Sequence, residues 1–426
     1  MLMLLIFVLL VAMICINVPI AIALAMSGVV GLLITEGTNS LVSIALDMYS
    51  GATKFSLIAI PMFVLAGAIM NAGGITDKLI NFVSALIGFI RGGLAMVNIG
   101  VSLFFAEISG SAVADVAAMG SILIPQMKKR GYSAPFSAAV TSSSASLAII
   151  IPPSIPMILY ASSANTSVEQ LFVAGVVPGL LGAAGLMFVA YVFARRYNLP
   201  TEEAFNTKRL RETFVDALPA FTLPVIILGG IFGGFVTATE AAGLAVIAAL
   251  IVSAWYRNLD LAHLRRAMLD GGIQTAVVML LVAASVLVGG FLTRAQVPQQ
   301  IAESILSLTS QQWVILLILN FFFLVVGFFL HSAAAIILVV PIVIPLITAA
   351  GIDPVHFGLV VTLNLAIGQQ TPPVASVLIT SCAVARANIW DVSKVNIWFI
   401  LVLLLVLGLC TYVPSVPLFL VEYFYR

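Results

Sequence analysis

Charge is scarce in this chain of 426 residues, and cysteine is nearly absent. Only 8% of the residues are Asp, Glu, Lys or Arg, against about 25% in soluble domains. The formal net charge is +1, which excludes the strongly basic surface that nucleic-acid partners require. The three cysteines, Cys15, Cys382 and Cys410, lie far apart in apolar runs, so they match no metal-ligand spacing. No polar segment is long enough to fold as a separate soluble domain.

Long apolar runs take the place of charge. Hydrophobic residues make up 62% of the chain, and the mean hydropathy is +1.20. Many runs reach the roughly 20 apolar residues that a helix needs to cross a bilayer. They include 1–35, 173–194, 218–255, 272–292, 312–347 and 396–421. The first run lacks a basic start and a small-residue cleavage site, so it predicts a first helix rather than a cleaved signal. The sequence therefore predicts an all-α polytopic protein of the lipid bilayer.

A Pro-Pro motif interrupts an apolar run in each half of the chain, 220 positions apart. The matching positions are Pro152 and Pro153 with Pro372 and Pro373, Pro125 with Pro345, and Gly131 with Gly351. Proline removes a backbone donor and clashes with the preceding turn, so each pair forces a helix to unwind. Inside a membrane, unwound backbone is tolerated only where it faces protein or a water-filled cavity. Paired breaks of this kind point to the binding site of a secondary transporter.

The basic residues predict the orientation, because Lys and Arg collect on the cytoplasmic side of membrane proteins. They are dense in 195–211 and in 257–266. Two apolar spans separate these segments, and two crossings return the chain to the side on which it started. Both basic segments can therefore be cytoplasmic. Basic residues also flank the stretch 93–127 but not the equivalent stretch 312–349. We therefore expect one re-entrant hairpin to enter from the cytoplasm and the other from outside, which makes the two repeats inverted relative to each other.

Polar residues at membrane depth gather in four groups, two in each half. The groups are Glu107 to Asp115, Thr141 to Ser146, His331 with Ser332, and Asn364 to Thr371. Hydroxyls and unwound carbonyls suit Na⁺, and helix N-termini suit a substrate carboxylate. Single Ser and Thr residues in membrane helices often only bond back to the preceding turn. The recurrence of all four groups in register favours a binding function.

The ionisable residues among these groups have two interpretations each. Asp115 and Glu107 are costly at membrane depth and are therefore functional candidates. Asp115 can instead complement the N-terminus of the following helix. His331 can contact a substrate or be a hydrogen-bonded structural residue. Arg386 can attract an anionic substrate or anchor the chain at the interface.

Long motifs resemble the large membrane subunit of tripartite ATP-independent periplasmic (TRAP) transporters. In the first half they are GGLAMVNIGVSLFFAEISGSAVADVAAMGSILIPQMKKRGY, SSSASLAIIIPPSIPMILYA and LFVAGVVPGLL, and in the second half GGFVTATEAAG and QQTPPV. The similarity covers essentially the whole chain. It implies a Na⁺-driven secondary importer of an organic acid, such as a C4-dicarboxylate, sialic acid or sugar acid. It also implies two partners, a small four-helix Q-type membrane subunit and a periplasmic P-type binding protein, in the bacterial inner membrane.

The resemblance further implies an elevator mechanism, in which a transport domain moves against a scaffold. The expected segments are 1–56 (N-terminal scaffold helices), 57–197 (repeat 1, with an arm helix, a hairpin at about 93–127 and a broken helix at about 134–164), 198–217 (cytoplasmic loop), 218–271 (scaffold helices), 272–395 (repeat 2, with an arm helix, a hairpin at about 312–349 and a broken helix at about 355–386) and 396–426 (C-terminal helix).

Within that picture each candidate residue receives a role. The expected Na⁺ ligands are Ser109, Gly110, Ser111, Asp115, Thr141, Ser142, Ser143, Ser146, Asn364, Gly368, Gln369 and Thr371. The expected substrate-binding residues are Ser111, Ser144, Pro152, Pro153, His331, Ser332, Gln370, Pro372, Pro373 and Arg386. We expect no catalytic residue, and Na⁺ is the expected coupling ion.

Three other functions compete with this interpretation. A self-sufficient Na⁺/dicarboxylate symporter of related architecture would need no binding protein. An intramembrane hydrolase would use Glu107, Asp115 or His331, but no nucleophile and base stand at a recognisable helical spacing. A channel fits less well, since one inverted pair of re-entrant segments is more typical of alternating access.

Overall fold

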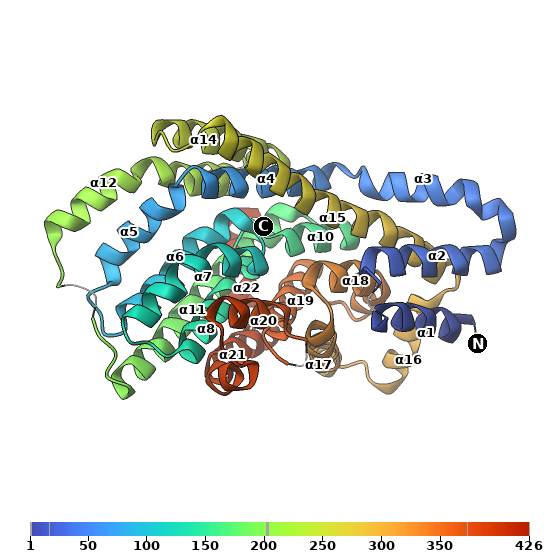
Figure 1. The fold of residues 1–426 in the computed structure, drawn as a ribbon. Helices are drawn as coiled ribbons and strands as arrows, with labels where there is room; N and C mark the ends of the chain where they lie inside the picture. The colour runs from blue at the N-terminus through green and yellow to red at the C-terminus, as the bar shows by residue number, and fades with distance from the viewer. Residues whose placement is uncertain (1, 17, 202–203, 373, 426) are drawn as a thin grey trace.

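The computed structural model describes residues 2–16, 18–201, 204–372 and 374–425, without the side chains of residues 2–4, 11, 15, 39, 41 and 107–109. Over these ranges all regular structure is helical and no strand is found (Figure 1). Nine of the described helices are long and apolar enough to cross a membrane. The predicted class, an all-α polytopic membrane protein, is therefore confirmed.

The helices follow one another along the chain with short connections. They are α1 (Leu2–Cys15), α2 (Ile20–Glu36), η1 (Gly37–Asn39), α3 (Ser40–Ala52), η2 (Phe55–Ile58), α4 (Ala59–Ala72), α5 (Ile75–Ile87), α6 (Gly93–Ser109), α7 (Ala112–Lys129), α8 (Ala134–Ala145), α9 (Leu147–Ile150), α10 (Ile155–Ala164), α11 (Val168–Arg196), α12 (Thr207–Pro224), η3 (Val225–Gly229, a π-helical segment), α13 (Gly230–Phe232), α14 (Ala238–Trp255), α15 (Leu261–Arg294), α16 (Val297–Leu308), α17 (Gln312–Phe329), α18 (Ser332–Ala349), α19 (Pro354–Gly368), α20 (Ser376–Ala385), α21 (Ile389–Tyr412) and α22 (Ser415–Tyr425).

Short polar side chains fix where several of these helices begin. Ser133 accepts a hydrogen bond from the backbone N–H of Phe136 at the start of α8, and Asp353 accepts two at the start of α19. Ser167 and Asn388 cap α11 and α21 in the same way. Each cap satisfies backbone donors that the first turn of a helix leaves unpaired.

The helices form a layer and a larger body beside it. In Figure 1 the layer runs across the top and contains α3, α4, α12, α14 and α15, while α6 to α11 and α17 to α22 lie below. Helix α14 packs on α4, and α15 packs on α2, α3 and α4. The buried side of α14 consists mostly of alanines, including Ala241, Ala245 and Ala249. Small residues allow membrane helices to approach closely.

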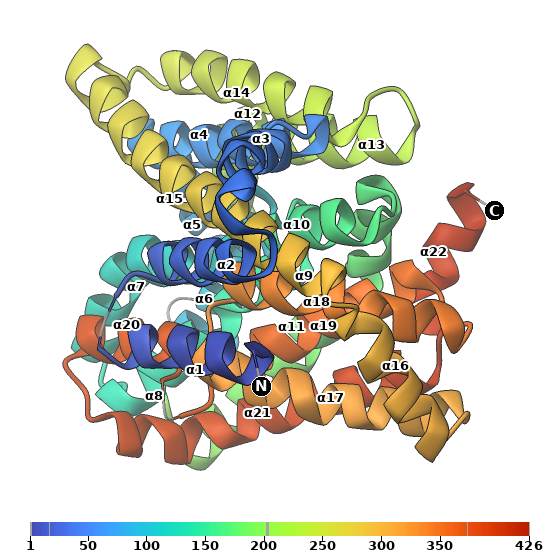
Figure 2. The same cartoon turned by 90° about the vertical axis from the view of Figure 1, so that its right-hand side faces the viewer.

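The centre of the body is built from the two helices that lead into the Pro-Pro motifs. From Val355 to Gly368, every residue of α19 is buried, and so is every residue of α8 from Phe136 onward. A helix that is buried on all sides must be surrounded by other helices. Figure 2 turns the view by 90° and places α19 inside the body, with α17 and α21 below it.

Three predicted boundaries differ from the structure. The expected loop 198–217 is shorter, because α12 already begins at Thr207, where Asn206 accepts hydrogen bonds from two backbone N–H groups. The expected boundary at 271 falls inside α15, which continues to Arg294. The expected single helix 396–426 is two helices, since α21 ends before Pro414, which cannot donate a backbone hydrogen bond.

Candidate functional site

The chain unwinds at the first Pro-Pro motif. Helix α9 ends at Ile150 and α10 begins at Ile155, and both Pro152 and Pro153 are buried between them. Ser154 stabilises the restart: its hydroxyl donates to the Ile149 carbonyl at 2.7 Å and accepts from the Met157 N–H at 3.4 Å. One side chain therefore satisfies backbone groups on both sides of the break.

The chain unwinds again before α20. Helix α19 ends at Gly368, and α20 begins at Ser376. Thr371 donates to the Ile367 carbonyl at 3.1 Å, and the Ser376 hydroxyl donates to Gln369 Oε1 at 3.3 Å. Pro372 is half-buried in this segment, whereas the predicted substrate residue Pro373 lies outside the described residues.

The turn between α6 and α7 lies against the first break. Gly110 in this turn has φ +57°, a left-handed conformation that favours glycine. A Cβ atom added there would lie 3.1 Å from the Pro153 carbonyl oxygen. Ser111 follows in extended conformation and is half-buried. The turn and the break are therefore in direct contact, as a shared binding site requires.

The turn between α17 and α18 holds the other predicted pair. His331 occupies the N-cap position of α18 and is exposed, and Ser332 behind it is buried. Helix α17 lies very close to α19, because a Cβ atom on Gly368 would come within 2.6 Å of the Gly327 backbone. The absence of a side chain at Gly368 thus allows the backbones of α17 and α19 to lie close together.

A buried hydrogen-bond network joins the two broken helices. Gln370 Nε2 donates to the Ser146 hydroxyl at 2.8 Å. The Ser143 hydroxyl donates to Asn396 Oδ1 at 2.7 Å, and Asn396 Nδ2 donates to the carbonyl and the side-chain oxygen of Gln370 at 3.3 and 3.4 Å. All four residues are buried. Polar residues that precede the two breaks are therefore bonded to each other directly, and Asn396 of α21 connects them a second time.

Asn98 of α6 holds the hydroxyls of α8. Its Nδ2 donates to Thr141 Oγ1 at 2.7 Å, and its Oδ1 accepts from the Ser144 hydroxyl at 3.1 Å. Ser102, one turn along α6, donates to the same Ser144 hydroxyl at 3.0 Å. These bonds fix α8 against the first hairpin helix.

Asn320 of α17 plays the corresponding part in the second half. Asn364 Nδ2 of α19 donates to Asn320 Oδ1 at 2.6 Å and to the Val360 carbonyl at 2.8 Å. Asn320 in turn donates to Thr411 Oγ1 of α21 at 3.2 Å. Asn364 lies 220 positions after Ser144, and Asn320 lies 222 positions after Asn98.

Two predicted ion ligands carry buried oxygen atoms with unmet hydrogen-bonding capacity. The Ser142 hydroxyl and Asn364 Oδ1 have no hydrogen-bond partner among the described residues. A buried polar atom without a partner costs about 1–3 kcal/mol. Neutral oxygens near unwound backbone are suitable ligands for Na⁺. The described chain offers no group of three or more His, Cys, Asp or Glu for a metal.

The remaining predicted site residues do not share one location in the structure. Asp115 is fully buried in the first turn of α7. The side chains of Ser109 and Glu107 lie outside the described residues. Arg386 is exposed just beyond the C-terminal end of α20, at the opposite end of that helix from the break. The structure therefore does not bring Arg386 to the other substrate candidates.

Sequence reasoning missed the three asparagines that organise the network. Asn98 and Asn320 each stand in an otherwise apolar stretch of a membrane helix, and Asn396 stands at the start of one, two residues after Lys394. A signal was available, since an amide at membrane depth needs partners and usually bonds across helices. A second signal was that Asn98 and Asn320 fall within two positions of the 220-residue repeat offset.

A cavity of about 380 Å³ lies between the layer and the first hairpin. Asn71 of α4 and Gln274 of α15 line it on one side, and Ala114, Ala117 and other small residues of α7 on the other. Ala114 lies three residues after Ser111, so the cavity reaches the first turn of α7.

Comparison with known proteins identifies the family of this chain. A family model described as "Tripartite ATP-independent periplasmic transporter, DctM component" matches residues 7–416. The C4-dicarboxylate TRAP transporter large permease protein DctM of Pseudomonas aeruginosa is 38% identical, over 93% of each chain. The sialic acid TRAP transporter large permease protein SiaM of Vibrio cholerae is 34% identical over 96% of each chain.

Two further matches are a longer permease protein and a solved structure. The isethionate TRAP transporter permease protein DctMQ of Oleidesulfovibrio alaskensis is 37% identical, over 95% of this chain and 64% of its own length. The crystal structure of the YdaH transporter of Alcanivorax borkumensis shares the fold, with a TM-score of 0.64, 13% identity and coverage of 92% and 90%. The relatives are permeases, which confirms that the chain is not an enzyme. The chain belongs to the DctM family, the large permease component of tripartite ATP-independent periplasmic transporters.

Proposed function

We propose that this permease imports an organic acid together with Na⁺, and that the ion and the acid bind where the two broken helices meet. The observation that carries the proposal is the network of Ser146, Gln370 and Asn396, with unmet oxygens at Ser142 and Asn364 beside it. A site shared by both halves allows ion and acid to stabilise each other's binding, because coupling free energies are reciprocal.

The proposed Na⁺ ligands come from both halves. In the first half they are Ser109, Gly110, Ser111, Asp115, Thr141, Ser142, Ser143 and Ser146, and in the second half Asn364, Gly368, Gln369 and Thr371. Ser142 and Asn364 fit best, since each presents a buried oxygen with no partner among the described residues. The bound ion would supply positive charge that favours an anionic substrate nearby. The hydroxyl and amide oxygens would orient it.

The proposed substrate site lies between the two hairpin turns. Ser111 and Ser332 stand at the starts of α7 and α18, and His331 is exposed beside Ser332. Helix N-termini favour a carboxylate through their unpaired N–H groups. The cavity beside Asn71 and Gln274 fits an access path to this site. Arg386 receives no support as a direct ligand.

The two halves would act as inverted repeats in an elevator movement. Several pairs of features support the repeat: Ser133 and Asp353 both cap helices 220 positions apart, and Asn98 with Ser144 corresponds to Asn320 with Asn364. Helix α7 packs on α20, and α18 packs on α10, so each hairpin contacts the other half's broken helix. The layer of α3, α4, α12, α14 and α15 would be the scaffold, together with α2, which packs on α15.

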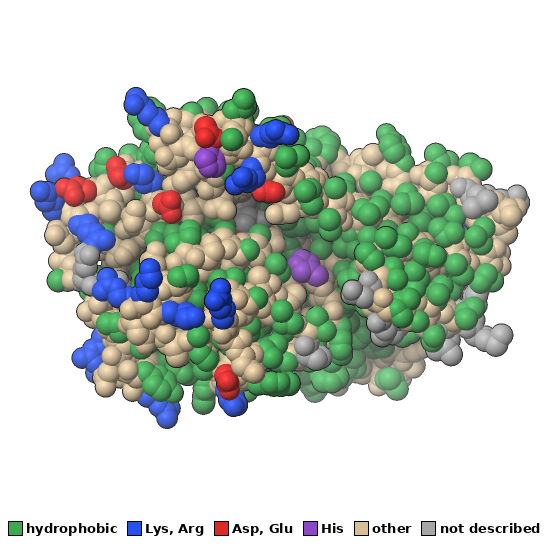
Figure 3. All heavy atoms as spheres, viewed as in Figure 1, with side chains coloured by type: hydrophobic (Ala, Val, Ile, Leu, Met, Phe, Trp, Pro, Cys, Tyr) green, Lys and Arg blue, Asp and Glu red, His purple; other side chains and the backbone are tan. Residues whose placement is uncertain are grey.

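Charge distribution supports the proposed orientation. In Figure 3 the Lys and Arg side chains gather at the end of the molecule where α5, α6, α7 and α12 lie in Figure 1, and the described side chains at the opposite end of this face are mainly hydrophobic. Basic residues favour the cytoplasmic side. The first hairpin, whose α7 ends at Lys128 and Lys129, would therefore enter from the cytoplasm of a bacterial inner membrane.

The transporter would work with a small Q-type membrane subunit and a periplasmic P-type binding protein. The relative named DctMQ supports the first partner, since this chain covers only 64% of it. The names of other relatives, which refer to C4-dicarboxylates and sialic acid, support a carboxylate substrate.

Uptake into proteoliposomes tests the proposal. The chain and its small subunit would be reconstituted, and radiolabelled succinate, N-acetylneuraminate and gluconate compared with and without a Na⁺ gradient and the cognate binding protein. We expect uptake of one acid that requires both Na⁺ and the binding protein. Uptake by this chain alone would instead support a self-sufficient symporter, and Na⁺-independent uptake would overturn the ion sites.

A further inference from the structure

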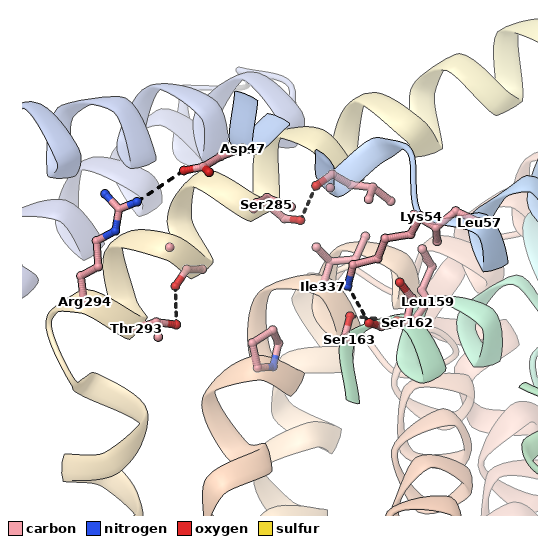
Figure 4. Close-up of a pocket in the computed structure, with 16 residues that line it drawn as sticks. Asp47, Lys54, Leu57, Leu159, Ser162, Ser163, Ser285, Thr293, Arg294 and Ile337 are labelled. Carbon is pink, nitrogen blue, oxygen red and sulfur yellow. Dashed lines mark hydrogen bonds and ion pairs between the residues drawn. The ribbon is translucent and has the colours of Figure 1, made fainter. Parts of the chain in front are cut away.

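A second polar cavity, separate from the central network, lies where α3 and α15 of the layer face α10 and α18 of the body. Its volume is about 310 Å³, and it is lined by Asp47, Lys54, Ser162, Ser285 and Arg294 among other residues. Figure 4 shows that Arg294 and Lys54 lie on opposite sides of it. The basic loops that precede α15 are at the other end of that helix, because Arg265 lies in its first turns and Arg294 at its end. The cavity is therefore in the proposed outer half of the protein.

The two cations of this cavity differ in how their charge is balanced. Arg294 donates to Glu36 and to Asp47, the latter at 3.5 Å. Lys54 forms no ion pair with any residue that the structure describes, and its Nζ donates to the Ser162 carbonyl oxygen at 2.9 Å. The Ser162 hydroxyl makes no hydrogen bond within the same described part of the chain. The cavity thus presents an ammonium and a hydroxyl without an acidic partner.

Another lysine, Lys128, also donates to a carbonyl near the end of a helix and serves as a comparison for Lys54. Lys128 of α7 donates to the Ala385 carbonyl at the end of α20, at 3.0 Å. Helices α10 and α20 follow the two breaks, and both end in a left-handed residue, Asn165 and Arg386. Lys128 belongs to the same body as α20, whereas Lys54 reaches α10 from the connection between α3 and η2, in the proposed scaffold. Lys54 alone of the two lines this cavity.

We propose that this cavity binds a carboxylate through Lys54, and that the carboxylate replaces the Ser162 carbonyl as the partner of the ammonium. The inference rests on the proposed function, since the carboxylate would be that of the transported acid. A charged acceptor binds an ammonium more strongly than a neutral carbonyl does. The exchange separates Lys54 from α10, so arrival of the acid removes a polar contact between the proposed scaffold and the proposed moving body.

Protection of Lys54 from an amine-reactive reagent tests the binding step without any transport. The full chain would be kept in a maltoside detergent, which carries no phosphate headgroup, and labelling of each lysine would be followed by mass spectrometry. Succinate, N-acetylneuraminate and gluconate would be compared with NaCl at equal ionic strength. We expect at least one acid to slow labelling of Lys54 about tenfold, with labelling of Lys128 unchanged. A phosphate-bearing lipid headgroup as the true ligand would give protection on adding phosphatidylglycerol and none with the acids, which would overturn the inference.

Variants connect this site to uptake. Lys54→Met and Lys54→Gln are both expected to raise KM about tenfold with little change in kcat, because neither side chain carries a charge for a carboxylate. Gln can still donate to Ser162, so it separates loss of the charge from loss of that bond. Lys128→Met is the matched control and should leave KM unchanged. Wild-type KM in both Lys54 variants together with unprotected Lys54 would overturn the inference while Na⁺-driven uptake stands. Protection of Lys54 without Na⁺-dependent uptake would support this site and overturn the proposed function.

Discussion

The first broken helix approaches its break with hydroxyls, and the second with amides. Thr141, Ser142, Ser143 and Ser144 lie in α8, whereas Asn364, Gln369 and Gln370 lead to the second break. A hydroxyl can satisfy itself against its own helix, as the Thr141 hydroxyl does with the Ser137 carbonyl at 2.9 Å. An amide has separate donor and acceptor atoms that need separate partners.

This difference explains why the amide half organises the junction. Gln370 uses its donor on Ser146 and its acceptor on Asn396, so it connects three helices. Asn364 donates from Nδ2 to Asn320, and its Oδ1 has no hydrogen-bond partner among the described residues. The hydroxyls of the first half therefore combine bonds within their own helix with bonds to Asn98 and Asn396, whereas the Gln370 side chain takes both of its partners from other segments. The following predictions test that contrast, from the largest expected effect to the smallest.

Replacing Gln370 with Leu should abolish most uptake. The change removes the bond to Ser146 and one of the two acceptors of the buried Asn396 amide, which keeps only the backbone carbonyl of residue 370. We expect at least about a tenfold loss in the rate of uptake into proteoliposomes. Ser381→Ala is the control, because that buried hydroxyl bonds only to the Leu378 carbonyl of its own helix. Unchanged uptake in Gln370→Leu would break the contrast between the two halves.

Gly368→Ala should destabilise the second half strongly. The added Cβ would stand 2.6 Å from the Gly327 backbone, which cannot move aside as a flexible side chain can. Overpacking of this kind typically costs about 1–3 kcal/mol, measured as a lower unfolding temperature in detergent. Gly408→Ala provides the comparison, since nothing lies within 4 Å of its Cβ position. Equal stability of the two variants would contradict the close approach of α17 and α19.

Asn364→Ala should weaken Na⁺ activation more than Ser142→Ala does. Both remove a buried oxygen without a described partner, but Asn364 also loses its bond to Asn320. We expect the Na⁺ concentration for half-maximal uptake to rise about tenfold for Asn364→Ala and by a smaller factor for Ser142→Ala. The reverse order would indicate that the hydroxyl half holds the ion.

Asn98→Ala and Asn320→Ala should have similar, modest effects on stability. Asn98 bonds across helices to Thr141, to Ser144 and more weakly to the Met127 sulfur, and Asn320 bonds to Asn364 and Thr411. Hydrogen bonds between membrane helices contribute about 1 kcal/mol each, which thermal unfolding of the purified protein can detect. Thr348→Ala, which removes an exposed hydroxyl bonded to its own helix, should be neutral. A large difference between the two asparagine variants would argue against equivalent roles.

Much of the fold followed from the sequence because membrane helices are marked by length and apolarity alone. The breaks around Pro152 and before α20 also followed, since proline acts on its own backbone regardless of context. The end of the loop at Thr207 and the split before Ser415 were missed, because caps and short turns depend on single residues.

The polar residues of the candidate site could be predicted from the sequence, but the hydrogen bonds that connect them could not. The polar residues before each break were recognised, and the structure joins them through Gln370 and Ser146. Asn396 was overlooked because its partners come from helices distant in sequence, and spacing along one helix cannot reveal them. The place of Arg386 could not be predicted either, since it depends on where α20 ends.

Thermal unfolding of the purified chain in NaCl and in choline chloride, at equal ionic strength, tests most directly whether the unmet oxygens hold Na⁺. A ligand that binds only the folded state raises the free energy of unfolding by RT ln(1 + L/Kd), where L is the ligand concentration, so the rise grows with that concentration. We predict that Na⁺ raises the unfolding temperature of the wild-type protein and has no specific effect on the double variant Ser142→Ala with Asn364→Ala. An equal rise in both proteins would contradict the proposed ion site.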